Sequence, residues 1–147
     1  MKTIVQIISG LFALLFLYAA GNKLLDYQKF KVQIGQSPIL TQYAAEIALL
    51  IPIVEIVIAI LLLRSINYQK STITALLASY SIMVMFSAYI IVILNFAERI
   101  PCSCGGILDQ MGWTTHLIFN LAFVAMAIAG VIIQYKIKQK EANYRPI

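Results

Sequence analysis

Four long apolar runs occupy most of this chain and leave few folds open to it. The runs cover residues 3–20, 43–63, 73–96 and 114–135. A helix needs about 20 predominantly apolar residues to cross a bilayer. In lipid every backbone hydrogen bond must be made within the protein, which excludes open sheet. We therefore predict an all-α integral membrane bundle of four transmembrane helices, built as a single domain over residues 1–147.

The composition supports a membrane protein and argues against a nucleic-acid-binding one. Hydrophobic residues make up 61% of the chain and charged residues 12%, whereas charged residues usually reach about 25% of a soluble domain. The net charge is +5, but the basic residues flank the apolar runs, where they meet lipid headgroups. We expect membrane lipids as partners and no nucleic acid. Tyr18 stands where a signal cleavage site needs a small residue, so we expect the first run to remain as an uncleaved helix.

The distribution of basic residues predicts the orientation of the bundle. Four spans place both termini on one side of the membrane. The termini side carries Lys2, Arg64, Lys70, Lys136, Lys138, Lys140 and Arg145, and the opposite side carries Lys23, Lys29, Lys31 and Arg99. Lysine and arginine are in excess on the cytoplasmic side of membrane proteins. We therefore predict a bacterial inner-membrane protein with both termini cytoplasmic and with residues 97–113 in the periplasm.

The connection before the last apolar run contains the chain's two cysteines, Cys102 and Cys104. Paired cysteines on an oxidising side tend to form structural or catalytic disulfides. A Cys-x-Cys bridge closes a small, tight ring that gains little chain-entropy stabilisation and is easily reduced. The spacing therefore favours a redox-active pair. Two alternatives remain open: a metal site that adds His116 with Asp109 or Glu98, and two thiols with no shared role.

Residues near the start of the last run are candidates for contact with a cofactor. His116 is the only histidine, and Asn120 follows four residues later on the same helical face. His116 could generate the attacking thiolate or donate a hydrogen bond to a quinone carbonyl. It could also be a structural residue whose ring is satisfied by a neighbouring helix. Trp113 is interpreted first as an interfacial anchor and second as a cofactor platform.

Two glutamates lie within the second run, where carboxylates are costly and usually turn inward. We expect Glu46 at the level of Lys23, Asn95 and His116, with an ion pair between Glu46 and Lys23. Glu55 is expected near mid-membrane, as a protonated carboxyl bonded to another helix. A role in proton transfer or in contact with a partner subunit is the alternative for Glu55.

A short interfacial helix is predicted in the first outer loop, where apolar side chains recur at helical spacing. These side chains are Leu24, Tyr27, Phe30 and Ile34, with the polar residues Asp26, Lys29, Lys31 and Gln33 between them. Gly35 would end this helix, and Ser37-Pro38 would begin the second span as N-cap and first-turn proline. We interpret the helix as a support at the headgroups; a docking surface for a partner is the alternative.

The segment Cys102-Ser103-Cys104-Gly105-Gly106 resembles the Cys-x-Cys-Phe/Gly-Gly signature of the methylamine-utilisation MauE family. The wider DoxX-like membrane family is similar at Gly21-Asn22-Lys23, at Phe30 and Ser37-Pro38, and at Pro52-x-x-Glu55. The likeness runs from about residue 10 to residue 135. It implies a four-helix membrane protein with Cys102 and Cys104 as the redox pair. MauE-type proteins are implicated in disulfide formation during maturation of the methylamine dehydrogenase small subunit.

The arrangement is also similar in outline to vitamin K epoxide reductases and quinone-linked disulfide-forming enzymes, which usually carry a second cysteine pair. Because this chain has one cysteine pair, that pair must react directly with both the electron donor and the electron acceptor, or another protein must carry out one of the two reactions. We predict a membrane thiol-disulfide oxidoreductase that exchanges with an exported cysteine-containing protein or a thioredoxin-like carrier. A membrane quinone is the expected electron acceptor. The alternative function is a non-catalytic membrane subunit or assembly factor with structural cysteines.

Overall fold

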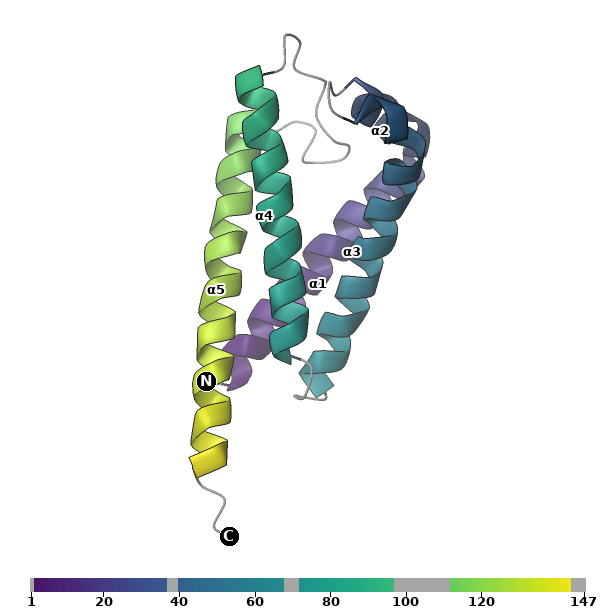
Figure 1. Ribbon diagram of the computed structural model, residues 1–147. Helices are drawn as coiled ribbons and strands as arrows, with labels where there is room; N and C mark the ends of the chain where they lie inside the picture. Colours follow the sequence, from purple (N-terminus) through teal and green to yellow (C-terminus); the bar gives the residue numbers. More distant parts are fainter. Residues whose placement is uncertain (1, 37–39, 68–71, 97–111, 144–147) are drawn as a thin grey trace.

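The computed structural model describes residues 2–36, 40–67, 72–96 and 112–143, and these residues form helices and no strands (Figure 1). The elements in chain order are α1 (Lys2–Leu25), α2 (Tyr27–Gly35), the 3-10 turn η1 (Thr41–Tyr43), α3 (Ala44–Asn67), α4 (Thr72–Phe96) and α5 (Trp113–Asn143). Four of the helices are long and apolar enough to cross a membrane. The predicted all-α, four-helix membrane bundle is confirmed.

The four long helices are arranged as two antiparallel pairs. α1 packs along α3, and α4 packs along α5, while α3 also contacts α4 and α1 also contacts α5. The pairs come together at the end that carries both termini and diverge toward the end that carries α2 (Figure 1). Lys2 Nζ lies 2.8 Å from Glu141 Oε1, which joins the start of α1 to the last turns of α5.

The core lies where the two pairs meet. Phe12, Phe16, Leu62 and Leu76 are its largest fully buried hydrophobic side chains. The ring of Phe12 meets the ring of Phe123 edge-on, with centroids 5.2 Å apart, and so joins α1 to α5. Small residues surround these side chains and let the helix backbones approach closely, as they do in membrane bundles. They are Ala13, Ala59, Ala75, Ala127 and Gly130.

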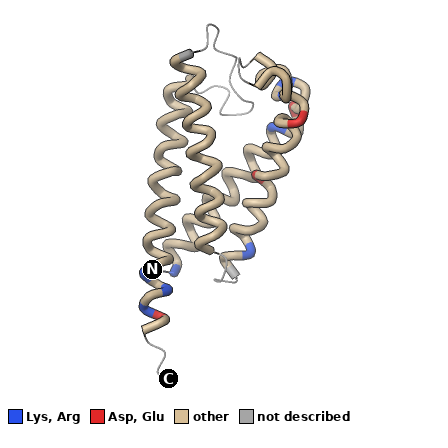
Figure 2. Tube along the Cα trace, in the orientation of Figure 1, with Lys and Arg blue, Asp and Glu red and all other residues tan. Residues whose placement is uncertain are grey.

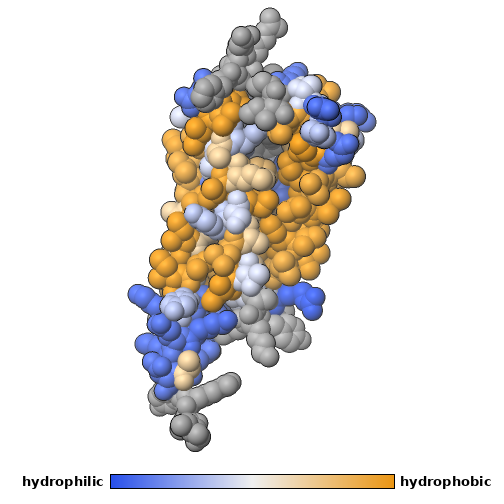
Figure 3. Space-filling model, viewed as in Figure 1, coloured by the Kyte–Doolittle hydropathy of each residue, from blue (hydrophilic) through white to orange (hydrophobic). Residues whose placement is uncertain are grey.

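The outer surface of the bundle is suited to lipid. A broad hydrophobic band separates two hydrophilic ends (Figure 3), and lysine, arginine and acidic residues are concentrated toward those ends (Figure 2). Large apolar side chains point outward along the band, among them Leu14, Leu50, Ile118 and Ile132. Contiguous exposed apolar surface of this extent is typical of a membrane protein.

Helix α2 packs against the α1–α3 pair at the end of the bundle at which the two pairs diverge (Figure 1). Its Phe30 and Ile34 are buried against Ala44 and Ala48 at the start of α3. The hydroxyl of Tyr27 donates a 3.2 Å hydrogen bond to the carbonyl of Ala45. The predicted short helix is thus present and ends at Gly35, but Leu24 belongs to α1.

The second long helix, α3, begins at Ala44, one residue after the start of the apolar run, and η1 precedes it. The predicted cap residues Ser37-Pro38 lie outside the described residues. The helices also extend beyond the apolar runs, since α1 continues to Leu25 and α5 to Asn143. Lysine, glutamine and glutamate are good helix formers, so α5 continues where its apolar run has ended.

Replacing Gly130 by valine tests the close packing of the core. A Cβ at this position would lie 3.3 Å from Ile8 Cγ2 and 3.3 Å from Leu76 Cδ1. Overpacking a filled core costs about 1–3 kcal/mol, so we expect Gly130→Val to lower the Tm measured in detergent. Gly10→Val is the matched control, because a Cβ there meets nothing within 4 Å. An equal fall in Tm for both variants would contradict this packing.

Candidate functional site

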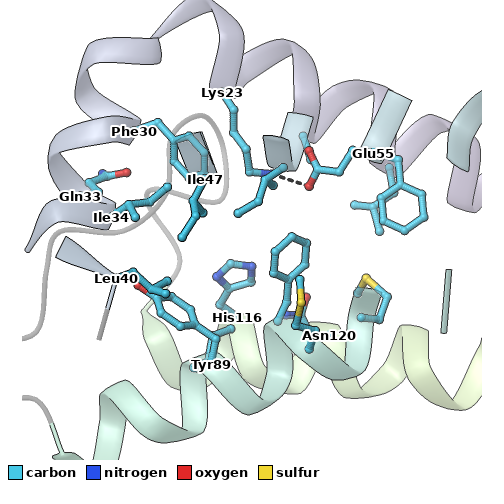
Figure 4. A pocket seen from close by; sticks show the side chains of 18 of the residues that line it. Lys23, Phe30, Gln33, Ile34, Leu40, Ile47, Glu55, Tyr89, His116 and Asn120 are labelled. Atoms are coloured by element: carbon cyan, nitrogen blue, oxygen red, sulfur yellow. Dashed lines mark hydrogen bonds and ion pairs between the residues drawn. The ribbon is translucent and has the colours of Figure 1, made fainter. Parts of the chain in front are cut away.

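A cavity of about 420 Å³ lies in the half of the bundle that is farther from the termini (Figure 4). The long helices alternate in direction, so the C-terminal halves of α1 and α4 meet the N-terminal halves of α3 and α5 there. The volume falls within the range of roughly 300–1,000 Å³ that is typical of small-molecule sites. The lining is mainly apolar and includes the rings of Phe16, Phe30, Phe86, Tyr89, Trp113 and Phe119.

One wall of the cavity carries a buried ion pair. Lys23 Nζ, from the last turn of α1, donates a 2.6 Å hydrogen bond to Glu55 Oε1, near the middle of α3 (Figure 4). The Glu55 side chain is 1% exposed and that of Lys23 is 14% exposed. The ammonium also lies 5.7 Å from the ring centroid of Phe30 and 5.6 Å from that of Phe86. Two aromatic faces therefore add cation–π attraction to the ion pair.

The predicted partner of Lys23 was wrong. Lys23 pairs with Glu55, whereas Glu46 is exposed in the first turn of α3. α1 continues through Lys23 to Leu25 and packs along α3, so Lys23 lies beside Glu55 near the middle of α3. The start of α3 packs against α2 through Ala44 and Ala48.

The opposite wall is formed by the first turns of α5. His116 and Asn120 project from this helix toward Lys23 and Glu55 (Figure 4). The helix starts at Trp113, and the backbone N–H of His116 donates a 2.9 Å hydrogen bond to the carbonyl of Gly112. Because Asn120 follows His116 by four residues, both side chains lie on one helical face. The structure thus brings together five of the predicted site residues: Lys23, Glu55, Trp113, His116 and Asn120.

Three buried polar atoms of the cavity residues have no hydrogen-bond partner within the described part of the chain. They are Glu55 Oε2, His116 Nδ1 and Asn120 Nδ2. A buried polar group left unsatisfied costs about 1–3 kcal/mol. These atoms, together with the remaining N–H groups of Lys23, are available for hydrogen bonds to a molecule in the cavity.

Other predicted site residues lie elsewhere. Asn95 is exposed near the end of α4, and its Nδ2 donates a 2.7 Å hydrogen bond to the carbonyl of Ile91 on the same helix. Cys102 and Cys104 lie outside the described residues, as do Glu98, Arg99 and Asp109. Within the described ranges, no three His, Cys, Asp or Glu side chains gather as metal ligands.

Gln33 is a cavity residue that the sequence analysis placed on the polar side of its helix. Its side chain is buried beside Phe30 and Ile34, and it lines the cavity from α2 (Figure 4). Gln33 stands three residues after Phe30 and one before Ile34, so the helical period already puts all three on one face. That spacing was the signal available in the sequence.

A protein-family model described as "Methylamine utilisation protein MauE" matches residues 1–133 of the chain. No curated protein and no solved structure matches it.

Removing one member of the buried ion pair should destabilise the bundle strongly. Lys23→Met leaves the Glu55 carboxylate buried without its cationic partner, which costs about 3–5 kcal/mol. We expect a matching loss in the free energy of unfolding in detergent, largely recovered in the double variant Lys23→Met/Glu55→Leu. Lys2→Met is the control, because it breaks the exposed pair with Glu141 and should cost no more than about 1 kcal/mol. Equal costs for the two single variants would show that the buried pair is dispensable.

Proposed function

This chain belongs to the methylamine-utilisation MauE family and is a multi-pass membrane protein, and from this we propose that it is a thiol-disulfide oxidoreductase. Cys102 and Cys104 form the redox pair. The pair acts at the periplasmic face of the bacterial inner membrane, with both termini in the cytoplasm. Its substrate is an exported cysteine-containing protein or a thioredoxin-like carrier, and a membrane quinone accepts the electrons.

The proposal is supported chiefly by the positions of the two helix ends that the cysteine-bearing connection joins. It joins the end of α4, at Phe96, to the start of α5, at Trp113. Trp113 and His116 in the first turn of α5 line the cavity with Tyr89 of α4. The described residues on both sides of the connection that carries the chain's two cysteines therefore lie at the end of the bundle that contains the polar cavity residues.

The reaction requires a disulfide and two substrate thiols. A substrate thiolate attacks one sulfur of the Cys102–Cys104 disulfide, which forms a mixed disulfide and releases the other sulfur as a thiolate. The second substrate thiolate attacks the mixed disulfide, so the substrate leaves oxidised and the pair is left as two thiols. Two S–H bonds of the pair then break, one S–S bond forms, and two electrons and two protons pass to a quinone, which becomes a quinol.

His116 is the residue that we propose for proton transfer from a thiol. It is the only histidine of the chain, and it lies one turn into the helix that follows the cysteines. Its Nδ1 is buried and has no hydrogen-bond partner among the described residues. An imidazole near neutral pH both accepts and returns a proton, which thiolate formation requires.

Oxidation of a dithiol by the purified protein tests the redox activity. The oxidised protein in nanodiscs should convert a reduced dithiol peptide to its disulfide, and Cys102→Ser or Cys104→Ser should abolish the conversion. Ser103→Ala is the matched control and should retain it, because both sulfurs remain. We expect the reduction potential of the pair to lie between about −120 and −230 mV, the range of thiol oxidants and glutaredoxins. A potential below about −300 mV, without peptide oxidation, would identify a structural disulfide and favour the non-catalytic subunit.

Labelling with a membrane-impermeant maleimide tests the orientation. On cells with a permeabilised outer membrane, we expect Cys102 and Cys104 to be labelled after treatment with a reductant and protected before it. Two single cysteines in a Cys102→Ser/Cys104→Ser background serve as references. Gln28→Cys, at an exposed position of α2, should be labelled from outside. Gln139→Cys, at an exposed position of α5 at the opposite end of the bundle, should not. The reverse pattern would invert the topology.

A further inference from the structure

We propose that the cavity is a binding site for the ring of a membrane quinone, with Lys23 and Asn120 as donors to the quinone and Glu55 and His116 as acceptors from the quinol. This inference rests on the proposed redox function, because it assigns the place where the electron acceptor binds. It uses only residues of the described helices.

The two walls of the cavity offer complementary hydrogen-bonding groups. On the α1 and α3 side, Lys23 Nζ retains N–H groups beyond the one donated to Glu55 Oε1, and Glu55 Oε2 is an unpaired acceptor. On the α5 side, Asn120 Nδ2 is an unpaired donor and His116 Nδ1 is an unpaired ring nitrogen. An imidazole nitrogen accepts when the proton is on the other ring nitrogen. Each wall therefore presents one donor and one acceptor (Figure 4).

This arrangement matches a ligand whose two oxygens change from acceptors to donors. The carbonyl oxygens of a quinone accept hydrogen bonds, which Lys23 and Asn120 supply from opposite walls. Reduction converts the carbonyls to hydroxyls, which donate to Glu55 and His116. Both redox forms are thus satisfied in one cavity. A lipid acyl chain would use none of these four groups, and a strongly charged solute would meet a mainly apolar lining.

The lining also suits an aromatic ring that carries a lipid tail. Phe86, Tyr89 and Phe119 are among the rings that surround the cavity, and aromatic faces stack on a planar conjugated ring. Leu50 of α3 and Met85 of α4 line the cavity and are also 58% and 50% exposed. The cavity therefore reaches the lipid-facing surface at α3 and α4, where an isoprenoid tail can leave.

Fluorescence of the only tryptophan gives a direct measure of binding. Trp113 lines the cavity, so decylubiquinone bound there should quench its emission in a saturable way. We expect Asn120→Leu to weaken the Kd about tenfold, the effect of losing one buried hydrogen bond. Asn95→Leu is the matched control and should bind as the wild type does, since Asn95 does not line the cavity and bonds its own helix. Ala19→Phe, which places a phenyl ring in the cavity, should abolish saturation while the Tm confirms folding.

The experiments distinguish a failure of the quinone site from a failure of the proposed redox function. The Cys102→Ser/Cys104→Ser variant should still bind decylubiquinone with an unchanged Kd, because neither sulfur belongs to the site. Unsaturable quenching, or equal Kd values for wild type, Asn120→Leu and Ala19→Phe, would overturn the quinone site and identify an acyl-chain cavity. Saturable binding sensitive to Asn120→Leu would support the site even if the wild-type protein failed to oxidise a dithiol, an outcome that would refute only the proposed redox function.

Discussion

A bilayer offers no hydrogen-bond partners, and this constraint governs every polar group in the structure. The backbone groups of the spans are satisfied within helices. Two buried serines of α4 follow the same rule: Ser79 and Ser87 donate to the carbonyls of Ala75 and Met83, at 2.9 and 2.8 Å. The charge of Lys23 is stabilised by the Glu55 carboxylate and by two aromatic rings. Against this background, Glu55 Oε2, His116 Nδ1 and Asn120 Nδ2 support the proposed ligand site, because a buried polar atom without a hydrogen bond is costly.

The bundle divides into a closed half and an open half, and packing explains the division. Near the termini, small residues and Gly130 let the helix pairs approach, and Phe12 and Leu76 fill the space between them. Toward α2 the pairs diverge (Figure 1), and the cavity is lined by residues of both pairs (Figure 4). The packed core of the closed half stabilises the fold, so the open half contributes less to its stability. A polar, partly unsatisfied site can therefore be tolerated in the open half.

Several features of the site were readable from the sequence and others were not. The resemblance to MauE, carried by a short cysteine motif, is confirmed by a family match that spans most of the chain. Polar residues within apolar runs, such as Glu55 and Asn120, are visible without coordinates because their burial is costly. The level of each residue in the membrane was less predictable. Lys23 was assigned to a loop because its apolar run had ended, yet α1 continues through it to Leu25.

The sequence by itself determined the fold class, because a run of about 20 apolar residues satisfies its backbone hydrogen bonds in lipid by forming an α-helix. It also determined which residues are candidates for the proposed chemistry, since thiols, carboxylates and an imidazole are defined by residue type. Only the tertiary structure decided which of them meet. Lys23 pairs with Glu55 rather than Glu46, because this contact depends on how α1 packs along α3. That packing is set by side chains far apart in the chain, and no local pattern records it.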